Sequence, residues 1–192
     1  MRIIAGQLRG KVIQAPKGDG TRPTIDRVRE SLFSSLYSSF GGFDDIHVLD
    51  AFAGSGAMGL EAVSRGAASA VFFEMDPAAA KVVERNISDC RLGAPQCTVR
   101  RADVLASPPV RPRHPFNLVL LDPPYAMDPA LVFGLMDRLA QSGALAPDAL
   151  VCYEHATATD LDEFAAQAQV AWELNSKRKY GKTTVNVYRR EQ

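Results

Sequence analysis

The stretch "IHVLDAFAGSGAMGL", residues 46–60, decides the fold of this 192-residue chain. Its apolar first half predicts a buried strand, and its last residues open a helix that extends to Gly66. Between them Gly54, Gly56 and Gly59 have the spacing G-x-G-x-x-G, which permits a tight turn and a close approach of a ligand to the backbone. The stretch therefore predicts a nucleotide-binding loop at the end of a strand.

Strand and helix patterns alternate from residue 46 to about residue 155. Apolar runs predict further strands at 69–75, 97–103, 117–122 and 149–155, and amphipathic segments predict helices at 77–90 and 129–143. Such alternation is typical of a parallel sheet covered by helices on both faces. We predict an α/β, Rossmann-like fold with a mostly seven-stranded, largely parallel sheet.

Both ends of the chain lie outside this alternation. Residues 1–14 contain two short β-prone runs and predict a hairpin, and residues 24–40 predict a helix that Thr24 can cap. A short helix at 160–168 and a terminal hairpin at 170–190 are expected at the other end. We expect a small N-terminal extension, residues 1–40, followed by a main domain, residues 41–192.

Composition and charge limit the class of protein. No apolar run approaches the length of a membrane span, and the N-terminus lacks the apolar core of a secretory signal. Three scattered cysteines and three scattered histidines predict a cytoplasmic protein without disulfides or a metal site. Residues 1–35 and 171–192 each carry a net charge of +4, whereas residues 36–170 carry −8. Basic ends on an acidic body are compatible with a nucleic-acid partner.

Four carboxylates stand at the ends of four consecutive predicted strands. They are Asp50, Glu74, Asp103 and Asp122. Ligands of open parallel sheets bind beyond the carboxyl ends of the strands. We therefore expect the four to face one shared cleft.

The glycine loop alone leaves two cofactors open. Glu74 is placed to accept hydrogen bonds from ribose hydroxyls, which suits NAD. Asp50 disfavours NAD, because a dinucleotide would bring its pyrophosphate close to this carboxylate. S-adenosylmethionine has an ammonium, a sulfonium, a ribose and no phosphate, and Asp103 can accept from its adenine amino group. The carboxylates favour S-adenosylmethionine.

A second motif, "FNLVLLDPPYAM" at residues 116–127, ends a buried strand on a carboxylate. Proline disfavours helical backbone in the preceding residue, so Asp122 is held extended at the strand end. The Asp122 carboxylate and the Pro123 carbonyl are both acceptors and suit an –NH₂ group, while Tyr125 offers a face for stacking a base. Two acceptors on a nucleobase amine free its lone pair for attack on a methyl group, and Asp122 can take the released proton.

These motifs resemble a known family. "DAFAGSG", "FEMD" and "LLDPPY" are similar to S-adenosylmethionine-dependent amino-methyltransferases. "MRIIAGQLRGK" and "TRPTIDRVRESLF" narrow the resemblance to the bacterial small-subunit rRNA guanine-N2 methyltransferase D family, over nearly the whole chain. The resemblance implies a class I methyltransferase fold, S-adenosylmethionine as cofactor, and guanine 966 of 16S rRNA in the assembling 30S subunit as target. It also implies an N-terminal hairpin that helps to grip RNA.

Site residues follow from the motifs and the resemblance together. Catalytic roles are expected for Asp122, Pro123 and Tyr125. Cofactor contacts are expected from Asp50, Phe52, Gly54, Ser55, Gly56, Glu74, Met75, Asp103 and Asp122. RNA contacts are expected from Arg22, Thr24, Arg27, Arg29 and Tyr125, although Arg27 and Arg29 can instead pair with nearby acids. No metal and a monomeric chain are expected.

Three other functions stay open at this point. A DNA amino-methyltransferase acting on adenine or cytosine shares the "DPPY" motif, although 192 residues leave little room for a base-recognition domain. An NAD-dependent oxidoreductase shares the glycine spacing, and a non-catalytic RNA-binding assembly factor can share the whole fold. We also expect that removing residues 1–20 spares the sheet and cofactor binding.

Overall fold

The computed structural model describes residues 1–16 and 23–191, and for residues 23–25 the backbone alone. The chain divides into two compact units, Met1–Ala102 and Asp103–Gln192. This division does not coincide with the expected boundary at residue 40. The RNA-binding role expected for residues 1–40 stays a prediction.

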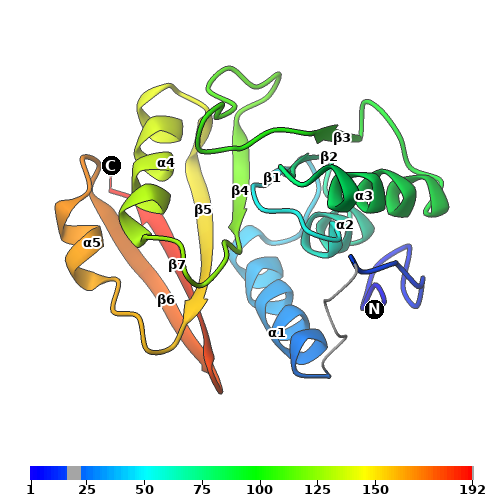
Figure 1. Ribbon diagram of the computed structural model, residues 1–192, viewed down its shortest axis with the longest axis horizontal. Coiled ribbons are helices and arrows are strands. Elements are labelled where there is room, and N and C mark those ends of the chain that lie inside the picture. Colours follow the sequence, from blue (N-terminus) through cyan, green and yellow to red (C-terminus); the bar gives the residue numbers. More distant parts are fainter. Residues whose placement is uncertain (17–22, 192) are drawn as a thin grey trace. The chain divides into compact units, whose positions relative to one another are not determined.

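The first unit is a three-stranded parallel sheet with its helices, as Figure 1 shows. The strand order is β3-β2-β1, and Leu49 pairs with Val71, which pairs with Thr98. Asp76 caps α3 by accepting a hydrogen bond from the Ala79 N–H at 2.7 Å, with Pro77 in the first turn. The elements are α1 (Pro23–Phe40), β1 (His47–Asp50), α2 (Ala57–Ser64), β2 (Ser69–Phe73), α3 (Pro77–Asp89) and β3 (Cys97–Arg100).

Glycines shape the turn from β1 into α2. Gly54 and Gly56 have φ angles of 54° and 78°, a region that other residues rarely adopt. At Gly59 an added Cβ would lie 2.3 Å from the Phe72 ring, so only glycine lets α2 pack this close to β2. The three positions of the motif thus set the turn and the helix–strand contact.

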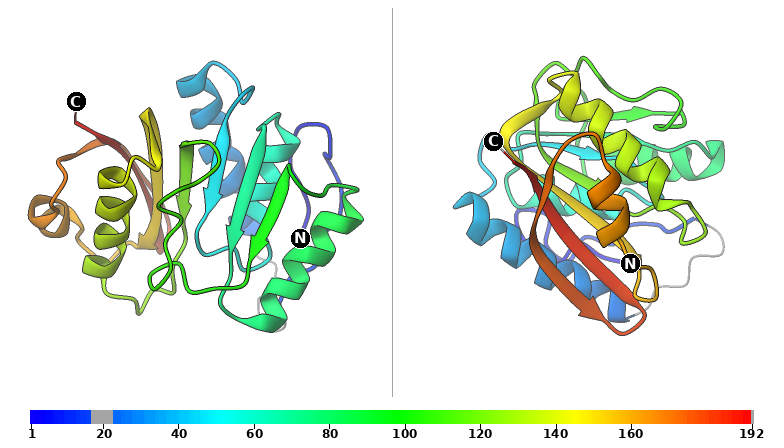
Figure 2. Two further views of the ribbon diagram at one scale, coloured as in Figure 1. Left: turned by 90° about the horizontal axis from the view of Figure 1, so that it is seen from above. Right: turned by 90° about the vertical axis from the view of Figure 1, so that its left-hand side faces the viewer.

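The second unit combines a parallel strand pair with an antiparallel hairpin (Figure 2). The strand order is β4-β5-β7-β6, and β5 pairs parallel with β4 and antiparallel with β7. Helix α4 packs Phe133 edge-on against Tyr153 and Tyr188. The elements are β4 (Phe116–Leu121), α4 (Pro129–Gln141), β5 (Leu145–Ala156), α5 (Asp162–Gln167), β6 (Trp172–Tyr180) and β7 (Thr183–Arg190).

Seven strands with mostly parallel pairing confirm the predicted α/β class. The terminal hairpin is also confirmed as β6 and β7. Strand β3 ends three residues earlier than predicted, at Arg100, whose carbonyl accepts the Ala102 N–H at 3.0 Å. Asp103 then turns the chain by accepting the Leu105 N–H at 2.8 Å. None of the described helices is long and apolar enough to cross a membrane.

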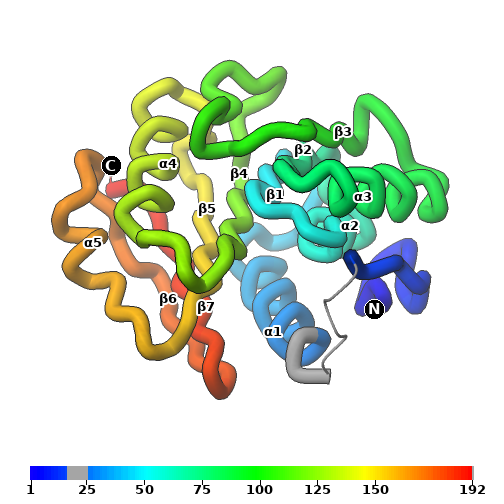
Figure 3. The backbone as a smooth tube through the Cα atoms, viewed as in Figure 1, coloured from blue at the N-terminus to red at the C-terminus, as the bar shows by residue number. Residues whose placement is uncertain are grey.

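The N-terminal segment, residues 1–16, forms less of a hairpin than predicted. A single antiparallel bridge joins Arg2 and Val12, flanked by a 3.0 Å hydrogen bond from the Ile3 N–H to the Lys11 carbonyl. Figure 3 shows the segment running beside α2. Ile3 and Ile13 are buried, so the segment is part of the core of the first unit.

Helix α2 holds this segment through a carboxylate. Glu61 is fully buried and accepts hydrogen bonds from the Ile4 and Ala5 N–H groups at 2.7 and 3.1 Å. It also pairs with Arg65 at 2.8 Å and with Arg29 at 3.7 Å. The partners that converge on Glu61 indicate that residues 1–16 stabilise the first unit. The expectation that removing residues 1–20 spares the sheet and cofactor binding stays a prediction.

Candidate active site

The predicted site residues fall into two groups. The glycine-loop group, residues 50–56 with Glu74 and Met75, lies in the first unit. The proline-motif group, residues 122–125, lies in the second unit with Asp103.

Asp50 lies beneath the glycine loop. Its side chain is 3% exposed, and its Oδ2 accepts the Gly59 N–H at 2.9 Å. Burial raises the pKa of Asp50 to about 7, the Gly59 hydrogen bond opposes this rise, and the charge of Glu74 adds to it. Asp50 therefore supports the first turn of α2 through the Gly59 N–H, and its cofactor contact stays a prediction.

This pKa predicts a pH-dependent stability. The folded pKa of about 7 exceeds the ordinary value of 3.8, so between these pH values the folded chain retains a proton that the unfolded chain has lost. The contribution of Asp50 to the unfolding free energy is thus complete below pH 4 and declines as the pH rises towards 7. We expect wild type to lose stability relative to Asp50→Asn between pH 5 and pH 8 in urea unfolding. Parallel pH profiles of the two proteins would contradict the assignment.

Carboxylate and carbonyl groups already occupy three of the N–H donors of the loop. The Gly54 N–H donates to Glu74 Oε2 at 2.8 Å, and the Ala53 N–H donates to the Phe73 carbonyl at 2.9 Å. The Gly56 N–H donates to the Ala53 carbonyl at 2.6 Å. A pyrophosphate needs such donors, and these three are not open to NAD. A Cβ added at Gly54 would meet nothing within 4 Å, so this part of the loop faces open space.

The other residues expected to contact the cofactor differ in their exposure to solvent. Met75, directly after Glu74, is 68% exposed, whereas Phe52 is only partly exposed. The hydroxyl of Ser55 is turned away, since it donates to the Met1 sulfur at 3.2 Å. Asp103 is partly exposed and uses Oδ1 for its own turn.

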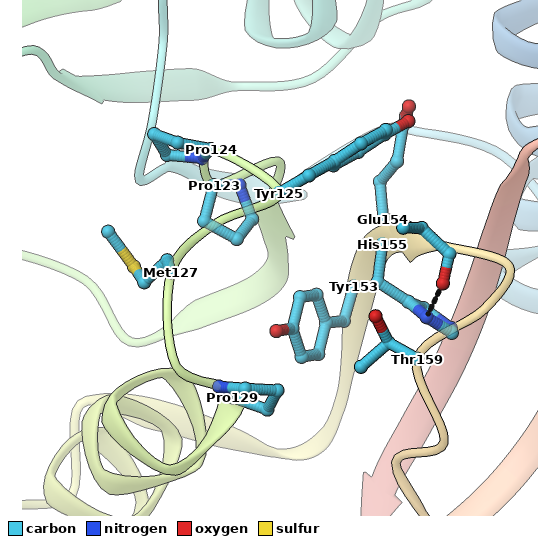
Figure 4. A pocket seen from close by; sticks show the side chains of 10 residues that line it. Pro123, Pro124, Tyr125, Met127, Pro129, Tyr153, Glu154, His155 and Thr159 are labelled. Carbon is cyan, nitrogen blue, oxygen red and sulfur yellow. Dashed lines mark hydrogen bonds between the residues drawn. The ribbon is translucent and has the colours of Figure 1, made fainter.

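Residues 123–125 of the proline-motif group line a hollow in the second unit (Figure 4). Pro123, Pro124 and Tyr125 form one wall, and Tyr153, Glu154 and His155 from β5 form another. Asp122 directly precedes this wall and is exposed at the end of β4. Tyr125 is 52% exposed, and its hydroxyl lies 2.7 Å from Thr183 Oγ1 at the start of β7. An exposed ring of this kind provides a stacking surface beside an acceptor.

Glu154 was missed by the sequence reading. Burial raises the pKa of its carboxyl, and a hydrogen bond with Tyr125 opposes this rise. Burial likewise raises the pKa of Tyr125. The signal that identified Asp122, a carboxylate at a strand end, applies equally to "VCYEH" at residues 151–155.

The RNA-contact candidates are only partly supported. Arg22 and the side chain of Thr24 lie outside the described residues. Arg27 is exposed on α1. Arg29 is 2% exposed and donates to Asp26 at 2.9 Å and to the Arg2 carbonyl at 2.6 Å, so its expected RNA contact is corrected to a structural ion pair.

Solved structures with this architecture define the class of protein. The chain matches "Putative methyltransferase yhhF from Escherichia coli" with a TM-score of 0.79 and 33% identity, covering 100% of this chain and 98% of that one. It matches putative methylase HI0767 from Haemophilus influenzae with a TM-score of 0.76 and 28% identity, covering 100% and 98%. The fold is the Rossmann-like fold of α/β methyltransferases.

The family can be stated more narrowly. Residues 1–189 match the family model described as "Conserved hypothetical protein 95", and the chain belongs to this family. It is 36% identical to ribosomal RNA small subunit methyltransferase D of Escherichia coli K12, over 100% of this chain and 90% of that protein. It is 30% identical to putative rRNA methyltransferase YlbH of Bacillus subtilis, over 99% of both. These full-length relatives confirm the resemblance inferred from the motifs.

Proposed function

We propose that this protein transfers a methyl group from S-adenosylmethionine to the exocyclic N2 of a guanine in 16S rRNA. Guanine 966 of the assembling 30S subunit is the proposed target. The observation that carries the proposal is the "DPPY" motif, in which the exposed Asp122 at the strand end directly precedes a hollow lined by Pro123 and the exposed ring of Tyr125. Relatives named as small-subunit rRNA methyltransferases, matched over 100% and 80% of this chain, support the RNA substrate.

The glycine-loop group fits the proposed cofactor. When bound, S-adenosylmethionine supplies a methyl group attached to a sulfonium sulfur. Transfer of this methyl group leaves the sulfur as a neutral thioether. Glu74 is partly exposed and can accept from ribose hydroxyls, while the exposed Met75 offers an apolar surface for adenine. In its ionised form the buried Asp50 carboxylate would attract a cationic ligand and repel a phosphate.

The proline-motif group acts on the amine. The Asp122 carboxylate and the Pro123 carbonyl accept hydrogen bonds from the –NH₂ of the guanine, which leaves the nitrogen lone pair directed at the methyl group. Asp122 or water then receives the proton that N2 loses. The proposal requires the amine and the methyl group to lie in line at near-contact distance, which supplies much of the acceleration.

Glu74→Ala tests the cofactor. We expect S-adenosylmethionine to bind the wild type and NAD not to bind, because three of the loop donors are already engaged. Glu74→Ala removes one or two ribose hydrogen bonds and weakens binding by about 1–3 kcal/mol. Isothermal titration calorimetry measures both, with the exposed Glu84→Ala as control. Tight NAD binding without binding of S-adenosylmethionine would favour the oxidoreductase alternative.

The RNA-binding surface is tested with two triple variants. Lys177 and Lys179 are exposed towards the end of β6, and Lys182 is exposed in the β6–β7 turn directly before Thr183, the partner of Tyr125. Arg9, Lys11 and Arg27 are exposed in the first unit. We expect glutamine substitution of either set to weaken 30S binding and to reduce the salt slope by roughly 0.7–0.9 per lost phosphate contact, with the larger effect at the β6–β7 turn. Unchanged slopes in both variants would place the RNA contacts elsewhere.

Nucleoside analysis tests the reaction itself. After incubation with 30S particles and labelled cofactor, the label should appear in N2-methylguanosine. Label in N6-methyladenine or N4-methylcytosine of DNA would favour the DNA methyltransferase alternative. Binding of the particle without any transfer would favour the assembly factor.

A further inference from the structure

The position of Glu154 follows from the pairing of β4 with β5. Leu121 and Tyr153 are partners in this parallel pair, so the next residues lie side by side, with Asp122 directly after β4 and Glu154 within β5. Neighbouring strands lie about 4.8 Å apart. A second carboxylate therefore stands beside the one proposed to hold the reacting amine.

Tyr125 links Glu154 to the base-stacking surface. The tyrosine hydroxyl is hydrogen-bonded to the Glu154 carboxyl and lies 2.7 Å from Thr183 Oγ1. Thr183 pairs with Ala156, two residues beyond Glu154, so both side chains lie on the same face of the sheet. Figure 4 shows the tip of Glu154 reaching the hydroxyl end of the Tyr125 ring. A base stacked on this ring would present its edge to Glu154.

We propose that Glu154 selects guanine by accepting a hydrogen bond from its N1–H. This inference rests on the proposed function and deepens it. The 2-amino group of guanine is flanked by N1–H, a donor, whereas the amino groups of adenine and cytosine are flanked by an unprotonated ring nitrogen, an acceptor. A carboxylate beside the amine attracts the first and repels the other two.

The contact also favours the reaction. As the methyl group joins N2, the purine gains positive charge and N1–H becomes a stronger donor. A charge-assisted hydrogen bond to Glu154 is thus stronger in the transition state than in the ground state. Glu154 is partly buried, and burial raises the pKa of its carboxyl, which increases the benefit of a donor from the base.

The test uses 2-aminopurine, which keeps the 2-amino group but has an acceptor at N1. Reconstituted 30S particles carry either guanine or 2-aminopurine at position 966, and kcat/KM is measured for both. Wild type should prefer guanine by at least ~10-fold. Glu154→Gln presents an amide N–H that can donate to N1 of 2-aminopurine, so its preference should fall to within about threefold, whereas the exposed Glu173→Gln should retain the wild-type preference.

The outcomes distinguish a failure of the proposed function from a failure of the role proposed for Glu154. If wild type does not methylate the guanine particle, the proposed function fails. If it does, but Glu154→Gln keeps the wild-type preference, the role of Glu154 is overturned. If Glu154→Gln does not fold, Tyr125→Phe decides, because it removes the hydroxyl partner of Glu154 and keeps the ring. A reduced guanine preference with this variant supports the proposal, and an unchanged one overturns it.

Discussion

Asp122→Ala is expected to lower kcat for methylation of 30S particles by at least ~100-fold, the scale seen when one positioned electrostatic group is removed. The substitution removes the acceptor that directs the amine and can receive its proton. The affinity for S-adenosylmethionine should stay within about threefold of wild type, although Asp122 also stands among the expected cofactor contacts. Single-turnover kinetics and calorimetry measure the two quantities separately.

Asp122→Asn should be milder, because the amide oxygen still accepts a hydrogen bond. Asp148→Ala is the matched control, since Asp148 is exposed towards the beginning of β5. Tyr125→Ala should lose a stacking surface worth roughly 1–3 kcal/mol. Normal turnover by Asp122→Ala would show that the amine is not held as proposed.

Glu61→Ala is expected to destabilise the protein by about 3–5 kcal/mol, the cost of removing one partner from a buried ion pair. Arg29 would be left buried without this carboxylate, and the Ile4 and Ala5 N–H groups would lose their acceptor. Urea unfolding monitored by circular dichroism measures the change. Removal of residues 1–16 should destabilise the first unit by the same mechanism.

Glu84→Ala provides the control for Glu61. Glu84 forms a surface ion pair with Arg101 at 3.6 Å, with both side chains about half exposed. Such pairs contribute about 0–1 kcal/mol. Equal effects of the two substitutions would mean that Glu61 does not anchor the N-terminal segment.

Local sequence patterns predicted most of the fold because strands and helices here follow regular apolar periods. The glycine spacing predicted a tight turn and a close approach of a ligand. The structure adds a reason that was not predicted, since Gly59 leaves no room for a side chain beside Phe72. The packing of residues 1–16 was not predictable in this way. Glu61 has the appearance of a solvent-facing helix residue, and its partners at Ile4 and Ala5 lie more than 50 positions away in the chain. Asn86 likewise joins Gln14 to the Ser55 carbonyl.

The sequence predicted which residues stand at the candidate site better than it predicted their burial and contacts. Asp50 and Glu74 stand at strand ends as expected, but the burial of Asp50 under Gly59 depends on how closely α2 packs. The sequence left open whether Arg29 contacts RNA or pairs with a nearby acid. Its burial and its contact with Asp26 assign it to an ion pair. Glu154 is identified as a candidate from the register of β4 and β5, which places it beside Asp122.

The most direct test of the proposed activity compares 30S particles, free 16S rRNA and duplex DNA as acceptors of a labelled methyl group. The protein and Asp122→Ala are assayed side by side, and the labelled nucleosides are identified by mass spectrometry. The account predicts N2-methylguanosine at a single position of 16S rRNA, formed fastest in the 30S particle and nearly lost with Asp122→Ala. Label in DNA, in another nucleoside, or in equal amount with Asp122→Ala would contradict it.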